Sequence, residues 1–120
     1  MPITSPARDD EAREVFLRLQ GVIRSTLVSY YLLTPEEADG AEEDLLPWFL
    51  RLARRSGASP MPPKALRLAL LSAACQYGRS LQMWKLGGRR STDPRLDDVL
   101  SREPEEFAVD LQMRLDEELP

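Results

Sequence analysis

The carboxylates at residues 39–44 are the group of side chains best placed to do chemistry. Glu42, Glu43 and Asp44 are consecutive, and Asp39 lies four residues before Glu43, so those two would share one face of a helix. Carboxylate oxygens on one face could bind a hard cation such as Mg²⁺ or Ca²⁺. Acids at the start of a helix also interact favourably with the helix dipole, and we favour this simpler interpretation of a solvated helix start.

Other residue types that commonly carry catalysis are scarce. The chain has no histidine, which removes the commonest general base and most zinc sites. Its single cysteine, Cys75, lies among alanines, which favours a buried structural thiol over a nucleophile. The sequence has no glycine-rich phosphate loop and no nucleophile elbow. We therefore predict that the protein is not an enzyme and uses no metal or other cofactor.

Charge divides the chain into three blocks. Residues 1–44 hold ten acids and four arginines, and residues 93–120 hold ten acids and three arginines, whereas residues 45–92 hold no acid. If the bases of this middle block share one face of the fold, they would form an anion-binding surface, with nucleic acid as the obvious partner. Alternatively, they pair with the acidic ends inside one fold, and both interpretations stay open. The nine bases are Arg51, Arg54, Arg55, Lys64, Arg67, Arg79, Lys85, Arg89 and Arg90.

Size and composition indicate one globular domain. The chain has 120 residues, of which 42% are hydrophobic and 30% charged, so neither general disorder nor a membrane protein is indicated. No stretch of about 18 residues is apolar and free of charge, and the N-terminus does not read as a secretory signal. We expect a cytoplasmic protein with no membrane partner and leave its oligomeric state open.

Helix signals occur along the whole chain, and no strand signal competes with them. Thr34 and Glu37 are spaced as a capping box. Pro47 predicts a break or kink, with Asp44 able to cap the restart. Gly87-Gly88 suits a helix end. We therefore predict an all-α, compact bundle of four to six helices with a long central helix. The first expected helix begins between Pro6 and Asp10 and ends near Leu33. The second spans 35–55 with the interruption at Pro47, and a loop follows at 56–63. The remaining helices are expected at 64–86, 94–100 and about 104–119.

The order of these features resembles the second domain of bacterial RNA polymerase sigma factors of the extracytoplasmic-function type. The resemblance spans residues 14–90. Ala41–Leu52, A-E-E-D-L-L-P-W-F-L-R-L, is similar to the family pattern A-E-D-L-V-Q-E-V-F-L-R-L. Leu66–Gln76, L-R-L-A-L-L-S-A-A-C-Q, with Ser80 beyond it, is similar to F-R-A-W-L-x-x-I-A-R-N-x-x-x-D.

Several positions depart from the family patterns. Ala69, Cys75 and Ser80 replace the tryptophan, arginine and aspartate of the long helix, and Pro47 replaces a glutamine. The family's helix-turn-helix domain has no counterpart in this chain. These departures put the promoter-melting activity of the family in doubt for this protein.

The resemblance implies two binding surfaces, one for RNA polymerase core and one for promoter DNA. The residues implied to dock on the polymerase are Asp44, Leu45, Phe49, Arg51 and Arg54. Those implied to face DNA are Arg67, Gln76, Arg79, Gln82, Trp84, Lys85, Arg89 and Arg90. Because an aromatic side chain among bases offers stacking as well as charge, we expect any DNA binding to prefer single strands.

The alternative to transcription is a helical protein-interaction or oligomerisation module with no nucleic-acid role. On either hypothesis we divide the chain into a helical domain at 1–100 and an acidic C-terminal helix at 101–120 that packs on it. Because the apolar stripe of this last helix is narrow, we expect its deletion to leave a folded domain. Clustered bases would favour the DNA hypothesis, and bases neutralised within the fold would favour the interaction module.

Overall fold

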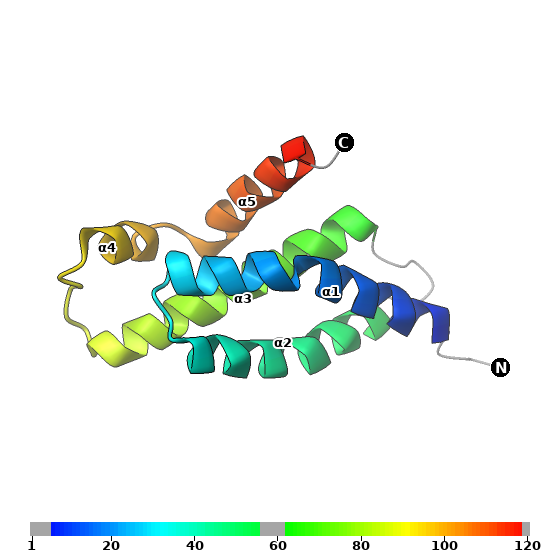
Figure 1. Cartoon of the computed structure of the whole chain (residues 1–120), viewed down its shortest axis with the longest axis horizontal. Coiled ribbons are helices and arrows are strands. Elements are labelled where there is room, and N and C mark those ends of the chain that lie inside the picture. The colour runs from blue at the N-terminus through cyan, green and yellow to red at the C-terminus, as the bar shows by residue number, and fades with distance from the viewer. Residues whose placement is uncertain (1–5, 56–61, 119–120) are drawn as a thin grey trace.

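The structure is a computed structural model that describes the backbone of residues 6–55 and 62–118 and the side chains of residues 10–54 and 62–117. These ranges contain five helices and no strand, which confirms the predicted all-α bundle (Figure 1). Most of the expected loop at 56–63, the side chain of Arg55 and the expected helix end at Leu119 lie outside the described residues. The helices are α1 (Pro6–Ser29), α2 (Pro35–Arg55), α3 (Pro63–Leu86), α4 (Pro94–Leu100) and α5 (Pro104–Glu118).

The turn between α1 and α2 begins earlier than the sequence predicted. α1 ends at Ser29 rather than Leu33, and Leu32 adopts a left-handed φ of 55° that turns the chain back. α2 then starts with the predicted capping box. The amide of Glu37 donates to the Thr34 hydroxyl at 3.2 Å, and the amide of Thr34 donates to the Glu37 carboxylate at 2.9 Å.

Of the break or kink predicted at Pro47, the break is wrong, because α2 continues through this residue to Arg55, and the kink stays a prediction. Proline inside a helix costs about 3 kcal/mol through a lost hydrogen bond and a steric clash. Pro47 itself is exposed, whereas Leu45 and Phe49 on either side of it are buried in the core. Packing of these neighbours holds the two halves of α2 in one helix, so Asp44 has no second helix to cap.

The core forms around α3, which contacts α1, α2 and α5. In Figure 1, α2 and α5 lie on opposite sides of α3, with α1 beside both α2 and α3. α3 packs closely at Gly78, because a Cβ atom here would lie 2.9 Å from Cδ2 of Leu27 in α1 and 2.8 Å from Cγ of Tyr31 in the turn that follows. The side chains of Leu70, Leu71 and Cys75 fill the neighbouring positions along the buried face of α3.

The C-terminal helices are also part of this core. α3 ends at Gly87, which has a left-handed φ of 57°. α4 is capped by Asp93, which accepts from the Arg95 amide at 2.9 Å. α5 buries Phe107, whose ring centroid lies 6.0 Å from that of Tyr31. The predicted division at residue 100 therefore falls within a single hydrophobic core. That residues 1–100 fold without the last helix stays a prediction.

Among the residues that the structure describes, no helix combines the length and the apolar character needed to span a membrane.

Candidate functional site

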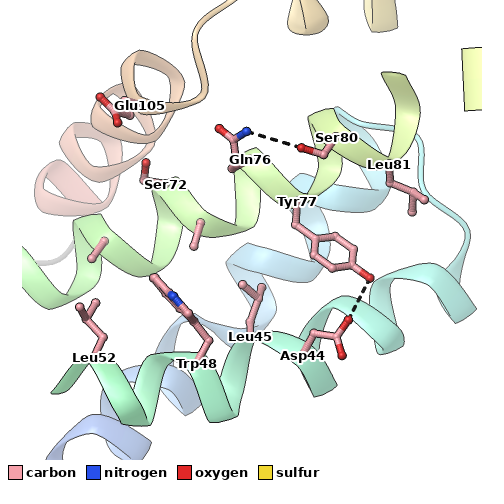
Figure 2. Close-up of a pocket in the computed structure, with 12 residues that line it drawn as sticks. Asp44, Leu45, Trp48, Leu52, Ser72, Gln76, Tyr77, Ser80, Leu81 and Glu105 are labelled. Atoms are coloured by element: carbon pink, nitrogen blue, oxygen red, sulfur yellow. Dashed lines mark hydrogen bonds between the residues drawn. The ribbon is translucent and has the colours of Figure 1, made fainter. Parts of the chain in front are cut away.

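An open apolar groove of about 940 Å³ lies along α2 and α3. Figure 2 shows its side chains, with those of α2 facing those of α3 across the space between the two helices. Leu45, Trp48 and Leu52 supply the α2 wall and are three and four residues apart, which is the spacing of one helix face. This face lies next to the face of α2 that packs on α1. Part of the apolar surface of α2 is therefore left uncovered by α1.

Small residues on α3 shape the opposite side of the groove. Ala69 and Ala73, four residues apart, leave room beside the half-buried indole of Trp48, and Leu81 adds apolar surface farther along α3. Alanine methyl groups project little from a helix, so the concavity results from their size. The groove therefore has the form of a shallow apolar channel between two helices.

The rim of the groove is polar and acidic. The Tyr77 hydroxyl donates to Asp44 at 3.4 Å, and the Gln76 amide donates to the Ser80 hydroxyl at 3.5 Å (Figure 2). Burial, and then the nearby Asp44 carboxylate, raise the pKa of Tyr77, so this hydroxyl stays protonated. The charged residues that line the groove are Asp44 and Glu105, and both are acids.

The residues predicted to dock on polymerase are divided between the groove and the core. Asp44 and Leu45 line the groove. Phe49 is fully buried, with its ring centroid 6.4 Å from that of Phe16, so it stabilises the fold and is not available to a partner. Arg51 is exposed on α2 and does not line the groove, and Arg54 is exposed and takes part in an interaction within the chain.

Several of the residues predicted to bind DNA contact other parts of the protein. Arg67 lies 3.5 Å from Asp116 of α5, and Arg79 donates from Nε to the carbonyl of Leu100 at 3.2 Å. Nζ of Lys85 lies 2.5 Å from the Glu37 carboxylate and is the main reason that the pKa of this carboxyl is lowered. Arg90 lies 3.6 Å from Asp97. Pairing within the fold thus accounts for much of the basic block.

The remaining predicted DNA residues differ in exposure. Gln82 is buried and donates to the carbonyls of Tyr31 and Leu32 at 2.6 and 3.3 Å, a structural role that leaves its amide unavailable to DNA. Trp84, in contrast, has 79% of its surface exposed. Arg89 and Gln76 are also exposed. Only part of the predicted DNA set therefore lies on a free surface.

Two of the acids at 39–44 interact with residues of α1. Arg24 pairs with Asp39 and also lies 3.9 Å from the Glu42 carboxylate, which accepts from the Gln20 amide at 3.2 Å. No three acidic or cysteine side chains in the described part of the chain gather in a way that could hold a metal ion. Cys75 is fully buried, and burial raises the pKa of its thiol to about 11, which disfavours the reactive thiolate.

Comparison with known proteins gives no match. No protein-family model fits the chain, and neither the curated proteins nor the solved structures include one that matches it. The likeness to sigma factors therefore stays a resemblance of motifs. From the sequence alone, Trp48 fits either a docking residue or a core residue, and it is half-buried in the groove wall. The sequence identifies Tyr77 and Ala73 only as residues of the long helix. It carries no signal that shows which face of this helix stays uncovered by the other helices.

Proposed function

We propose that this protein is a protein-docking domain that holds an amphipathic helix of a partner in the groove between α2 and α3. The observation that carries the proposal is the apolar wall of the half-buried Trp48 and Leu52, next to the buried Leu45, which is left open beside small residues of α3. Recognition of an amphipathic helix by an apolar groove is a recurring mode of protein binding. A third helix laid along α2 and α3 would bury this surface as α1 buries the adjacent one.

Charge favours a partner helix with basic residues beside its apolar stripe. Asp44 and Glu105, the charged residues of the lining, are acidic, and complementary charge increases both association rate and specificity. The sigma-factor resemblance offers one identity for the partner, RNA polymerase core, because it assigns Asp44 and Leu45 to polymerase docking. Binding of polymerase is a proposal that rests on this resemblance, whereas the helix-binding groove rests on the geometry.

Peptide titration would test the groove directly. In a Trp84→Phe background Trp48 is the single tryptophan, so its fluorescence reports occupancy of the groove. We expect a leucine- and lysine-based amphipathic peptide of about 18 residues, five helical turns, to shift the Trp48 emission to shorter wavelength with saturation. A peptide of the same composition in scrambled order should bind more weakly, because it lacks an apolar stripe.

Matched variants give the test its control. Leu52→Glu places a charge in the groove and should weaken peptide binding about tenfold or more. Leu17→Glu makes the same change at an exposed position of α1, outside the groove, and should bind as the parent does. Circular dichroism would show that both variants are folded. Equal binding by the two variants, or by the two peptides, would contradict the proposal. Co-elution with RNA polymerase core, lost in Leu52→Glu, would identify the partner.

A second candidate function is single-stranded nucleic-acid binding at the end of α3. Trp84 is exposed and is followed by Arg89 and Arg90, both exposed, on a turn that contains two glycines. The Arg90–Asp97 pair is solvent-exposed and therefore weak, so a phosphate could replace Asp97. Titration of a labelled single-stranded oligonucleotide at low salt would test this. An Arg89→Glu, Arg90→Glu double variant should lose the binding, and binding unchanged in that variant would exclude this site.

A further inference from the structure

A second hollow, of about 400 Å³, lies where the end of α1, α4 and the start of α5 meet. In Figure 1 the connection between α4 and α5 passes close to the C-terminal end of α1. Arg95, Arg102 and Arg114 line this hollow together with Tyr30, the residue that follows α1. We propose that it is a binding site for a phosphate monoester of a small molecule. The site is separate from the groove and does not depend on its function.

The three arginines of this hollow are far apart in the sequence of the acidic C-terminal block. Residues 93–120 contain ten acids and three bases, and all three bases line this one hollow. They come from three different segments, since Arg95 is in α4, Arg102 is in the α4–α5 connection and Arg114 is in α5. Guanidinium groups repel one another, so three arginines that line one hollow favour an anion bound between them.

One of the three arginines is paired within the protein, because Nε of Arg95 lies 3.7 Å from the Asp93 carboxylate, and in the described part of the chain the other two are not. Nη1 of Arg114 lies 3.5 Å from the Tyr30 hydroxyl, and Arg102 lies over the Phe107 ring, with its central carbon 5.8 Å from the ring centroid. Within the described residues, neither of these two arginines has a carboxylate within ion-pair distance. These neutral contacts orient the guanidinium groups without satisfying their charge.

The ligand class follows from charge and shape. One acid, Asp98, also lines the hollow, and Arg95 is paired with Asp93, so Arg102 and Arg114 are the two arginines left to bind an anion. A phosphate monoester carries close to two negative charges at neutral pH, and guanidinium groups bind phosphate oxygens through pairs of parallel hydrogen bonds. The hollow is larger than a phosphate group, and the half-exposed ring of Tyr30 offers a flat surface for the rest of the ligand. A nucleoside monophosphate has both features.

Calorimetric titration of the full chain would test the site, with inorganic phosphate and adenosine monophosphate as probes. We expect both to bind, with the nucleotide at least several-fold tighter because its base contacts Tyr30. Arg102→Gln and Arg114→Gln should each weaken binding about tenfold, the effect of losing one charge-assisted interaction of about 1.4 kcal/mol. Both side chains are exposed, so the variants should fold, and circular dichroism would verify this.

Two controls distinguish binding in this hollow from general charge attraction and from binding in the groove. Arg13→Gln removes an exposed arginine of α1 outside the hollow and should leave binding unchanged. Leu52→Glu, which blocks the groove, should also leave it unchanged, so failure of one proposal is distinguishable from failure of the other. Equal loss in Arg13→Gln and Arg102→Gln would show general charge attraction and overturn the site. Absence of binding by either probe at millimolar concentration would overturn it as well. Equal affinity for the two probes would refute the role of Tyr30.

Discussion

Replacing Gly78 by alanine tests how closely α3 and α1 pack. The added Cβ would lie 2.8 Å from Cγ of Tyr31 and 2.9 Å from Cδ2 of Leu27, closer than carbon atoms normally approach. Both neighbours are fully buried, so neither can rotate away into solvent. Forcing extra volume into a packed core typically costs about 1–3 kcal/mol. Alanine also favours the helix over glycine by about 1 kcal/mol, which offsets part of that cost.

Gly21 supplies the matched control, because it lies in α1 with no atom within 4 Å of an added Cβ. Gly21→Ala should gain the helix preference alone and stabilise the protein by about 0.5–1 kcal/mol. The two variants should therefore differ in unfolding free energy by the packing cost, about 1–3 kcal/mol, with Gly78→Ala the less stable. Urea titration followed by circular dichroism would measure this difference. If Gly78→Ala is as stable as Gly21→Ala, then α3 and α1 are not in the close contact described.

Three further changes test other parts of the fold. Because burial raises the pKa of the Cys75 thiol from 9.0 to about 11, its contribution to stability is full below pH 9 and is lost as pH rises towards 11. The unfolding free energy of Cys75→Ala should therefore fall about 2 kcal/mol less than that of the parent as the pH rises to 11. If the unfolding free energies of the two proteins change identically with pH, the raised pKa of Cys75 is refuted. Thr34→Ala should cost about 1 kcal/mol in a thermal melt and Thr34→Ser much less, since serine keeps the capping hydroxyl. Deleting 101–120 should leave a folded but less stable chain, because loss of Phe107 uncovers Tyr31, and absence of a cooperative melt would show that residues 1–100 do not fold without α5.

Local signals in the sequence were sufficient to locate most helix ends. Thr34 and Gly87 act as the caps that their residue types and spacing predicted, and α4 spans the expected residues 94–100. The two partners of each capping contact are only a few residues apart in the chain, so these contacts can be predicted from the local sequence. The helical class follows from the same signals, because each capped segment has apolar residues at helical spacing.

The errors arise where contacts distant in sequence prevail over local preference. Pro47 is a strong local signal for a break, yet burial of Leu45 and Phe49 keeps α2 continuous. Apolar spacing continues from α1 into Tyr31, which is buried by packing against Phe107 after the helix has ended. Periodicity alone cannot separate a buried residue in a helix from a buried residue in the turn that follows.

The candidate sites were harder to predict because they depend on which helix faces remain uncovered. The sequence shows that α2 and α3 each carry apolar residues, but the position of α5 decides which face of α3 is free. Gln82 and Trp84 are two residues apart and looked equivalent as DNA contacts, yet one is buried and the other exposed. Likewise, the three arginines of the C-terminal block are scattered in sequence and meet only through the path of α4 and α5.

The hydrogen bonds of Gln82 have a consequence for the order in which the protein folds. This side chain of α3 binds the carbonyls of Tyr31 and Leu32, so the turn that ends α1 is completed by a residue about fifty positions later in the chain. Part of this turn forms locally, because the Leu33 amide donates to the Leu27 carbonyl at 3.0 Å, but the Tyr31 and Leu32 carbonyls acquire their Gln82 partner only when α3 docks. Completion of the turn should therefore come late, on the native side of the folding barrier, and loss of the Gln82 amide should accelerate unfolding more than it slows folding.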